Sequence, residues 1–275
     1  MRAIVWRTLL REQATFNQVF FTVNEGYLLN NILPFRLGEI GRAFILSRKA
    51  DIGFWEVFSS ILIERILDMA FAVSVLLITI PFVVGADWAL QAAFGVGLLV
   101  VVGFLLLYLL AAKREAAINI FDLLSDKWSI LNKFGSERVE AFFNGLAVLT
   151  DGKRFLKAIM WMIVDWGIAI FQYFLILIAF YPGGKILWST FTLSGAALGM
   201  AAPSSPGAVG VFELSIIAAL SVFGIKASIA LAVAITAHLF QFLITGLLGA
   251  IGFIRDGESL LGIYRRSSEI PQNPS

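Results

Sequence analysis

The stretch Pro34-Phe35-Arg36-Leu37-Gly38 interrupts one apolar region of this chain, and Pro206-Gly207-Ala208-Val209-Gly210 interrupts a second one 172 residues later. Proline cannot continue the hydrogen-bond ladder of a helix, and a nearby glycine lets the backbone turn or approach another segment closely. Backbone freed in this way must be satisfied by protein or water, so broken helices at membrane depth line cavities. Matching breaks in two halves of a chain indicate the binding site of a transporter built from repeats.

The composition is that of an integral membrane protein. Hydrophobic residues make up 59% of the 275 residues and charged residues 15%, with a mean hydropathy of +0.86; these values exclude an ordinary soluble domain. The net charge of +2 is too small to indicate nucleic-acid binding, and the absence of cysteine excludes disulfides and thiolate metal sites. Five apolar segments are about long enough to cross roughly 30 Å of hydrocarbon: 69–86, 88–112, 158–180, 186–212 and 227–254.

Basic residues predict the orientation, because Lys and Arg in short loops stay on the cytoplasmic side. Segment 113–157 carries eight of them, the turn at 85–88 carries none, and the turns at Lys185 and Lys226 carry one each. We therefore expect helices 55–85 and 157–181 to run outward and helices 88–112 and 227–254 to run inward. Segment 113–157 and the C-terminus would then lie in the cytoplasm, with the chain in the inner membrane.

Segment 186–224 must begin and end on the outer side, which predicts a re-entrant hairpin with residues 202–207 at its tip. The polar segment 16–47 is its counterpart from the cytoplasmic side, with residues 34–38 at the tip. Hairpins that enter from opposite sides indicate inverted repeats, so we predict an all-α polytopic membrane protein. The shift of 172 residues also places helix 55–85 on helix 227–254, and brings Arg65 and Asp68 close to His238 and Gln241.

The chain reads as a single transmembrane domain over residues 1–275. The same shift places the counterpart of helix 157–181 before residue 1, so we expect an N-terminal helix to be missing. Within the domain, segment 113–157 holds apolar residues at helical spacing opposite charged ones. This pattern predicts amphipathic helices that lie on the inner leaflet, with connection or regulation as their role.

Three ordered strings carry a family resemblance: residues 31–42 (NILPFRLGEIGR), Glu64-Arg65 with Asp68, and residues 206–213 (PGAVGVFE). They resemble the lysylphosphatidylglycerol synthase transmembrane-region family, also called flippase-like domain proteins. The resemblance covers most of the chain and implies a polytopic inner-membrane protein that moves an amphiphilic lipid or a lipid-linked sugar between leaflets. Fused members carry a soluble aminoacyl-transferase domain that these residues do not contain, so synthase activity is not carried over. His238 departs from the pattern, because we expect an arginine there.

The charged residues near the breaks suit lipid flipping on physical grounds. An unpaired charge at the bilayer centre costs at least about 3 kcal/mol, and a polar groove lowers that barrier. Guanidinium groups hold phosphate through a planar fork of donors, and broken helix ends offer backbone N–H groups. Carboxylates could orient the arginines, accept an amine or carry a proton. The predicted substrate-binding residues are Arg36, Glu39, Arg42, Glu64, Arg65, Asp68 and Glu213, and the predicted structural breaks are Pro34, Gly38, Pro203, Pro206, Gly207 and Gly210.

Structural explanations compete with these roles. Ion pairs within one or two turns of a helix can simply tie helices together, and basic side chains of a shallow hairpin can snorkel to the cytoplasm. A first-turn carboxylate such as Glu213 is favoured by the helix dipole. Asp165 would pair with an arginine or face an internal cavity, and His238 and Gln241 would form interhelical hydrogen bonds.

Two other function classes stay open. An intramembrane enzyme needs a nucleophile or a metal constellation, but the chain has no cysteine and a single histidine; we therefore expect no catalytic residue, metal or cofactor. A non-catalytic scaffold that partners a separate glycosyltransferase or aminoacyl transferase is the main alternative to transport of a membrane lipid or lipid-linked substrate, and a homo-oligomer is a further option. A continuous polar path between the two hairpin tips would favour the flippase.

Overall fold

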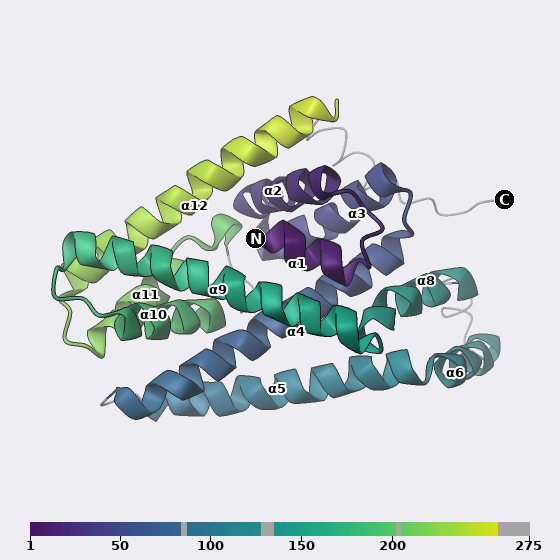
Figure 1. The fold of residues 1–275 in the computed structure, drawn as a ribbon, viewed down its shortest axis with the longest axis horizontal. Coiled ribbons are helices and arrows are strands. Elements are labelled where there is room, and N and C mark those ends of the chain that lie inside the picture. Colours follow the sequence, from purple (N-terminus) through teal and green to yellow (C-terminus); the bar gives the residue numbers. More distant parts are fainter. Residues whose placement is uncertain (84–86, 128–134, 202–204, 258–275) are drawn as a thin grey trace.

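The computed structural model describes residues 1–83, 87–127, 135–201 and 205–257 (Figure 1). The described ranges hold helices and no β-strand, which confirms the predicted all-α class. The elements in chain order are α1 (Arg2–Leu9), α2 (Phe16–Ile32), the 3₁₀ turn η1 (Pro34–Arg36), α3 (Gly38–Ala50), α4 (Phe54–Thr79), η2 (Ile80–Phe82), α5 (Asp87–Ala112), α6 (Arg114–Lys127), α8 (Ser136–Leu146), η3 (Ala147–Leu149), α9 (Gly152–Phe180), α10 (Ile186–Gly199), η4 (Pro206–Ala208), α11 (Val211–Ser221) and α12 (Ala227–Arg255).

Two sets of helices repeat with the spacing seen in the sequence. A shift of 172 residues places α2, η1, α3 and α4 on α10, η4, α11 and α12, and η1 falls on η4 residue for residue. The packing repeats as well, because α2 lies against α12 as α10 lies against α4, and the tips η1 and η4 contact each other. The two hairpins approach this contact from opposite ends of the molecule (Figure 1), so the repeats are inverted.

Helix α1 changes one expectation about the repeat. Its residues 2–9 match the positions that the shift assigns to residues 174–181, at the end of α9, and α1 packs against both α9 and α2. The counterpart of helix 157–181 therefore does not fall wholly before residue 1. Its last two turns are present as α1, which the sequence pattern concealed because the segment is short and contains Arg2 and Arg7.

Each hairpin tip places a left-handed turn directly after its proline. Phe35 and Arg36 both have a φ of 56°, and at the matching positions of the second tip Gly207 and Ala208 have φ values of 63° and 57°. Left-handed geometry costs a non-glycine residue roughly 1–2 kcal/mol. The same strained turn at both tips is therefore held by its surroundings, as strained backbone at functional sites is.

Two other predicted breaks, Gly38 and Gly210, lie where the second arm of each hairpin begins. Gly38 begins α3, where a Cβ would lie 2.2 Å from the carbonyl oxygen of Gly26 on α2. Gly210 precedes α11 with a φ of 88°, a conformation that favours glycine. Pro34 and Pro206 begin the two 3₁₀ turns, and Pro203 lies outside the described residues.

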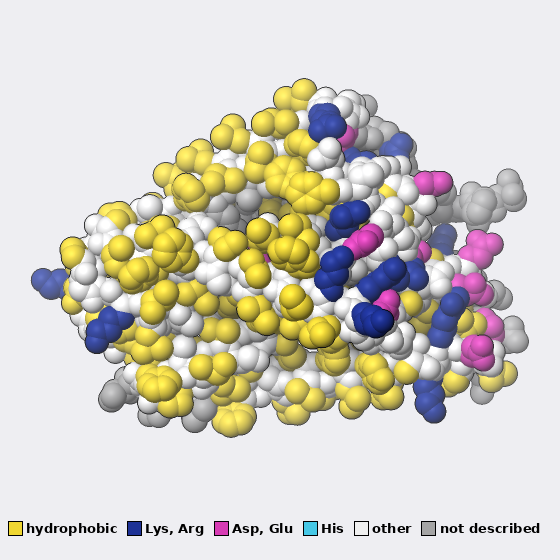
Figure 2. Space-filling model, viewed as in Figure 1, with side chains coloured by type: hydrophobic (Ala, Val, Ile, Leu, Met, Phe, Trp, Pro, Cys, Tyr) yellow, Lys and Arg dark blue, Asp and Glu magenta, His cyan; other side chains and the backbone are white. Residues whose placement is uncertain are grey.

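In the part of the chain that the structure describes, three helices are long and apolar enough to cross a membrane by length and composition: residues Ala93–Ala112 of α5, and the whole of α9 and α12. Helices α10 and α11 are apolar but shorter. Large hydrophobic side chains on the three long helices are exposed, among them Leu99 (72%) and Leu247 (65%), which suits contact with lipid chains. Charged side chains gather at the end that holds α6 and α8, whereas hydrophobic ones cover much of the remaining face (Figure 2).

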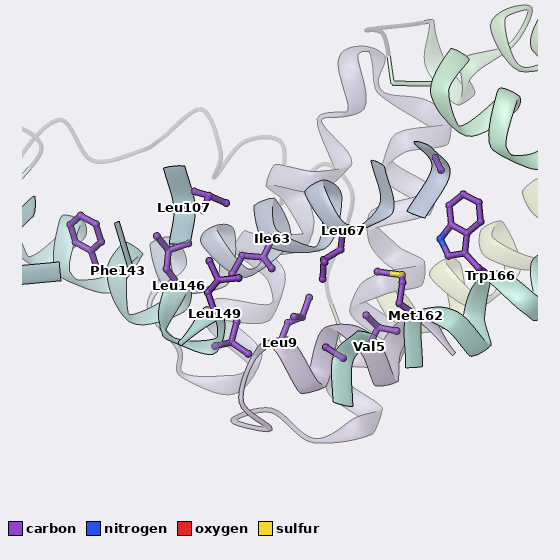
Figure 3. Packing of buried hydrophobic residues seen from close by; sticks show 13 residues of the cluster. Val5, Leu9, Ile63, Leu67, Leu107, Phe143, Leu146, Leu149, Met162 and Trp166 are labelled. Atoms are coloured by element: carbon purple, nitrogen blue, oxygen red, sulfur yellow. The ribbon is translucent and has the colours of Figure 1, made fainter. Parts of the chain in front are cut away.

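A buried hydrophobic cluster joins the first repeat to the elements that follow it. Figure 3 shows Val5 and Leu9 of α1 facing Ile63 and Leu67 of α4, with Met162 of α9 beside them. Phe143 and Leu146 of α8 extend the same cluster. The cluster therefore fixes α1, α4 and α9 relative to one another, and these three helices carry most of the charged site.

The predicted leaflet helices of segment 113–157 divide into two kinds. Helix α6 exposes Ile120 and Leu123 (57% and 71%), as an interfacial helix would. Helix α8 instead packs its apolar face on α4, and a Cβ at its Gly145 would meet the Ser59 hydroxyl at 1.8 Å. The expectation that both helices lie on the leaflet is wrong for α8, because α4 offers a matching apolar face.

Glycines on α12 allow close contact with α2. A Cβ at Gly249 would lie 2.6 Å from the carbonyl oxygen of Asn24 and 2.7 Å from Leu28 Cβ, whereas a Cβ at Gly246 would meet nothing within 4 Å. Small residues are a common means of helix association in membranes.

We therefore expect Gly249→Ala to lower the melting temperature of the purified protein, because overpacking costs about 1–3 kcal/mol. Gly246→Ala is the matched control one turn away, and should leave stability unchanged or raise it, since alanine favours helix over glycine by roughly 1 kcal/mol. Equal melting temperatures for the two variants would contradict the close packing of α2 and α12.

The distribution of charge generates a topology prediction. Lys185 and Lys226 precede α10 and α12, and Ser136 begins α8 at the charge-rich end. Single cysteines at Lys185 and Lys226 should react with an impermeant maleimide added outside intact cells, and one at Ser136 should react only after permeabilisation. External labelling of the Ser136 variant would reverse the orientation. The predicted cytoplasmic C-terminal tail falls on residues 258–275, outside the described residues.

Candidate functional site

The centre of the molecule holds a cluster of paired charges built on α4. Glu64 is fully buried; its Oε2 accepts a hydrogen bond of 2.8 Å from Arg42 Nη2, and its Oε1 accepts one of 3.0 Å from Arg65 Nη2. Asp68, one turn along, lies 3.4 Å from Arg65 Nη2. Glu39 of α3 lies 3.1 Å from Arg42 and 3.7 Å from Arg65. The i, i+3 spacing within each helix brings these groups to one face.

Arg2 of α1 extends the cluster to α9. Its Nη1 donates to Asp68 Oδ1 at 2.6 Å, and its Nη2 lies 3.2 Å from Asp165 Oδ2. One guanidinium thus joins α1, α4 and α9. The sequence predicted that Asp165 would either pair with an arginine or face an internal cavity. It does both, because it pairs with Arg2 and lines the cavity described below.

Arg42 is enclosed. Its side chain is 2% exposed, and the ring of Trp6 lies 4.3 Å from its guanidinium carbon. The Trp6 indole N–H donates to the Ser60 hydroxyl at 3.0 Å, which fixes the ring. A cation held between carboxylates and an aromatic face is a structural group, and Arg42 has no route to a substrate in this conformation.

A cavity of about 250 Å³ lies between the two repeats, next to the cluster. Arg65 and Asp68 line one side, and the tip residue Arg36 lines another. The Arg36 guanidinium donates to the carbonyl oxygen of Met200 at the end of α10, so the first tip is held to the second hairpin. The polar residues from the second repeat that line the cavity are Ser205, His238 and Gln241.

The second repeat carries a histidine–carboxylate pair where the first carries the ion cluster. Glu213 Oε1 lies 2.5 Å from His238 Nδ1, Glu213 Oε2 accepts from the Gly210 amide at 2.6 Å, and His238 Nε2 lies 2.8 Å from the Gly207 carbonyl oxygen. His238 is therefore an interhelical hydrogen-bond partner, as its sequence position suggests. Glu213 itself does not line the cavity; it meets it through His238.

The structure thus divides the seven predicted substrate-binding residues into three groups. Four of them line the cavity, Glu213 lies behind His238, and Arg42 and Glu64 are enclosed beneath the cavity. The four lining residues are Arg36, Glu39, Arg65 and Asp68.

Sequence reasoning missed Arg2, Trp6 and Tyr27. Arg2 and Tyr27 line the cavity, and Trp6 holds Arg42. Arg2 is separated from its partners by more than sixty residues of chain, and the first nine residues matched no expected element. A signal did exist, because Asp165 is the only charge in an apolar run and needs a basic partner.

A second ion cluster joins the first hairpin to α12. Lys49 Nζ lies 2.7 Å from the fully buried Glu25 Oε2 and also contacts the Asp256 carboxylate. It ties α2 and α3 to the end of α12, away from the cavity. Within the described residues, no group of three or more potential ligands is placed to hold a metal ion.

Comparison with known proteins decides the family. The family described as lysylphosphatidylglycerol synthase TM region matches residues 1–249. The chain belongs to this family. It is also similar to a UPF0104 membrane protein of Methanocaldococcus jannaschii, with 25% identity over 226 residues that cover 82% of this chain and 92% of the archaeal protein. No solved structure matches.

Membership in the lysylphosphatidylglycerol synthase TM region family agrees with the membrane-embedded, all-α fold. The match takes in both hairpins, α4, and α12 up to residue 249, so it includes the whole cavity lining. The charged cluster therefore lies within the membrane region that defines the family.

The enclosed position of Glu64 generates a stability prediction. Glu64→Gln should destabilise the protein by about 3–5 kcal/mol, because removing one partner leaves Arg42 and Arg65 buried with less compensating charge. The measurement is thermal unfolding in detergent.

Glu12→Gln is the matched control. Glu12 is 43% exposed and pairs with Lys157 at 2.5 Å, and that hydrogen bond holds the pKa of Glu12 below its ordinary value. Exposed pairs contribute little, so this variant should melt like the parent. A Glu64→Gln protein that melts with its control would show that the buried network is dispensable for folding.

Proposed function

We propose that this protein moves an anionic phospholipid or a polyprenyl-phosphate-linked sugar between the leaflets of the inner membrane. The observation that carries the proposal is the cavity between the inverted repeats, because polar groups from both hairpin tips line it. A scaffold does not need polar groups of the two hairpin tips to line one cavity. A lipid carrier does need a polar surface that continues from one side of the membrane to the other.

Arg65 is the group best placed to receive a phosphate. It lines the cavity and is 26% exposed, and its contacts with Asp68 and Glu39 are long, at 3.4 and 3.7 Å. Buried guanidinium nitrogens of both Arg65 and Arg42 lack a hydrogen-bond partner, but of the two arginines Arg65 lines the cavity. A phosphate oxygen in the cavity would compete with the longer carboxylate contacts for the Arg65 guanidinium.

The balance of charge in the cluster explains how the Arg65 guanidinium can remain buried in the membrane when no substrate is bound. Four guanidinium groups, those of Arg2, Arg36, Arg42 and Arg65, lie among four carboxylates, those of Glu39, Glu64, Asp68 and Asp165. The cluster is therefore close to neutral, which lowers the cost of burial. A lipid phosphate would compete with the carboxylates for the arginines, so binding would be reversible.

A place for the hydrocarbon chain lies on the other face of the second hairpin. An apolar groove of about 440 Å³ runs between α4, α5, α10 and α11, and Leu76, Leu198 and Leu214 line it. Ala197 and Met200 line the polar cavity from the same end of α10. A head group in the cavity and a chain in the groove would thus straddle the tip of one hairpin.

We expect Arg65→Ala to lower transport at least about tenfold, equal to about 1.4 kcal/mol of lost transition-state stabilisation. Arg65→Lys should restore part of the rate, since it keeps the charge but loses the planar fork. The assay is movement of fluorescent phosphatidylglycerol between leaflets of proteoliposomes, after expression and melting are shown to be normal.

Arg154→Ala is the control, because Arg154 is 45% exposed at the start of α9 and lies outside the cavity lining. It should transport at the parental rate. A well-folded Arg65→Ala protein with parental transport would remove Arg65 from the site. A parental protein that moves neither phosphatidylglycerol nor a polyprenyl phosphate would favour the scaffold that partners a separate transferase.

A further inference from the structure

The imidazole of His238 joins α12 to two parts of the second hairpin. Its Nδ1 faces Glu213 Oε1 on α11 at 2.5 Å, and its Nε2 faces the Gly207 carbonyl oxygen in the tip turn η4 at 2.8 Å. The rings of Phe212 and Phe242 also pack against it, with centroids 4.5 and 5.2 Å from the imidazole. The ring is therefore fixed, and both of its nitrogens are committed to oxygens.

These two contacts require a particular number of protons. The Gly207 carbonyl can only accept, so Nε2 must carry a proton. The remaining pair, Nδ1 and Oε1, must then share one further proton, either as an imidazolium with a carboxylate or as a neutral imidazole with a carboxylic acid. Both forms have the same total charge of zero, which suits a side-chain pair only 12% and 16% exposed.

Loss of the shared proton breaks one of the two contacts. If the remaining proton stays on Nε2, the lone pair of Nδ1 faces a carboxylate. If it moves to Nδ1, the hydrogen bond to the carboxylate is kept and that to Gly207 is lost. The second arrangement is favoured, because hydrogen bonds to charged acceptors are roughly twice as strong. Deprotonation therefore removes the hydrogen bond that joins the hairpin tip to α12.

We propose that the Glu213–His238 pair is a proton-binding site that holds the tip of the second hairpin against α12, and that release of the proton frees the tip. The tip residues Gly207 and Ala208 line the cavity between the repeats, so their movement opens or closes one of its walls. Only the link between this tip movement and lipid transport rests on the proposed function. If the two are linked, the proton is the ion that the protein takes up and releases during transport.

Other titratable and charged groups line the same cavity, and the test must distinguish their titration from that of the pair. None of them forms a hydrogen bond with Glu213 or His238, but all of them line the same cavity from the elements packed around it. They are Arg2 on α1, Tyr27 on α2, Arg36 at the first tip, Glu39 on α3, Arg65 and Asp68 on α4, and Asp165 on α9.

The test is a distance measurement that requires no lipid transport. Spin labels at Val209→Cys beside the tip and Leu156→Cys on α9 report the tip against the body, since both positions are about 60% exposed and the chain has no native cysteine. The protein is held in phosphatidylcholine nanodiscs between about pH 5 and about pH 9, a range that brackets histidine titration. We expect one narrow distance at low pH and a second, displaced population at high pH.

Two variants make the assignment specific. In Glu213→Gln the amide N–H can donate to Nδ1 while the amide oxygen accepts from Gly210, so the tip should stay in its low-pH position at every pH. In His238→Phe the ring packing is kept but both hydrogen bonds are lost, so the displaced population should appear at every pH. Labels at Leu156→Cys and Leu247→Cys, which join α9 to α12, should show no change with pH.

Three results would overturn the proposal. The first is a parental tip distance that does not change over the pH range. The second is a Glu213→Gln variant that shifts as the parent does, which would assign the titration to another cavity group. The third is an equal shift in the α9–α12 control pair. None of these depends on whether the parental protein moves lipid, so failure of the proton site and failure of the proposed transport are distinguishable.

Discussion

The pairing of Glu64 with Arg42 and Arg65 is the interaction on which the arrangement of the first repeat depends. A fully buried carboxylate is tolerated only if charge and hydrogen bonds compensate it, and Glu64 receives both from two arginines. One arginine comes from α3 and the other from α4 itself, so the first hairpin cannot leave α4 without exposing an uncompensated charge. Arg2 then draws α1 and α9 to the same point through Asp68 and Asp165.

The two repeats share a backbone plan but differ in chemistry. Both tips place a proline before a left-handed turn, and each hairpin packs on a long helix of the other repeat. The ion cluster holds four arginines and three carboxylates of the first repeat together with Asp165 of α9, whereas the second hairpin and α12 meet through one carboxylate, Glu213, and His238. Such an asymmetry is what we expect if the related halves have the different tasks that we propose. The arginine side suits an anionic ligand, and the histidine side suits a proton.

Much of the fold could be predicted from the amino-acid sequence, because the membrane restricts the secondary structures that a spanning segment can adopt. Apolar segments longer than a span must be helices, and the matched breaks at Pro34 and Pro206 revealed the repeat. The expectations that failed share a different origin. Helix α8 packs on α4 although its amphipathic pattern predicted a leaflet helix, and α1 supplies part of a helix that was expected to be absent. In both cases the pattern identified a helix but not the surface that covers it.

The sequence by itself determined the class, the repeat and the chemical types in the site, because composition and the positions of proline, glycine and charge are local properties. It could not determine which charges meet. Arg42 and Arg65 look alike in sequence, yet Trp6 and Glu39 enclose one and the cavity exposes the other. Only the tertiary structure decided this, since partners such as Arg2 and Asp165, or Gly207 and His238, are joined by packing across helices. The free energy of a buried charge depends on those neighbours and not on its place in the chain.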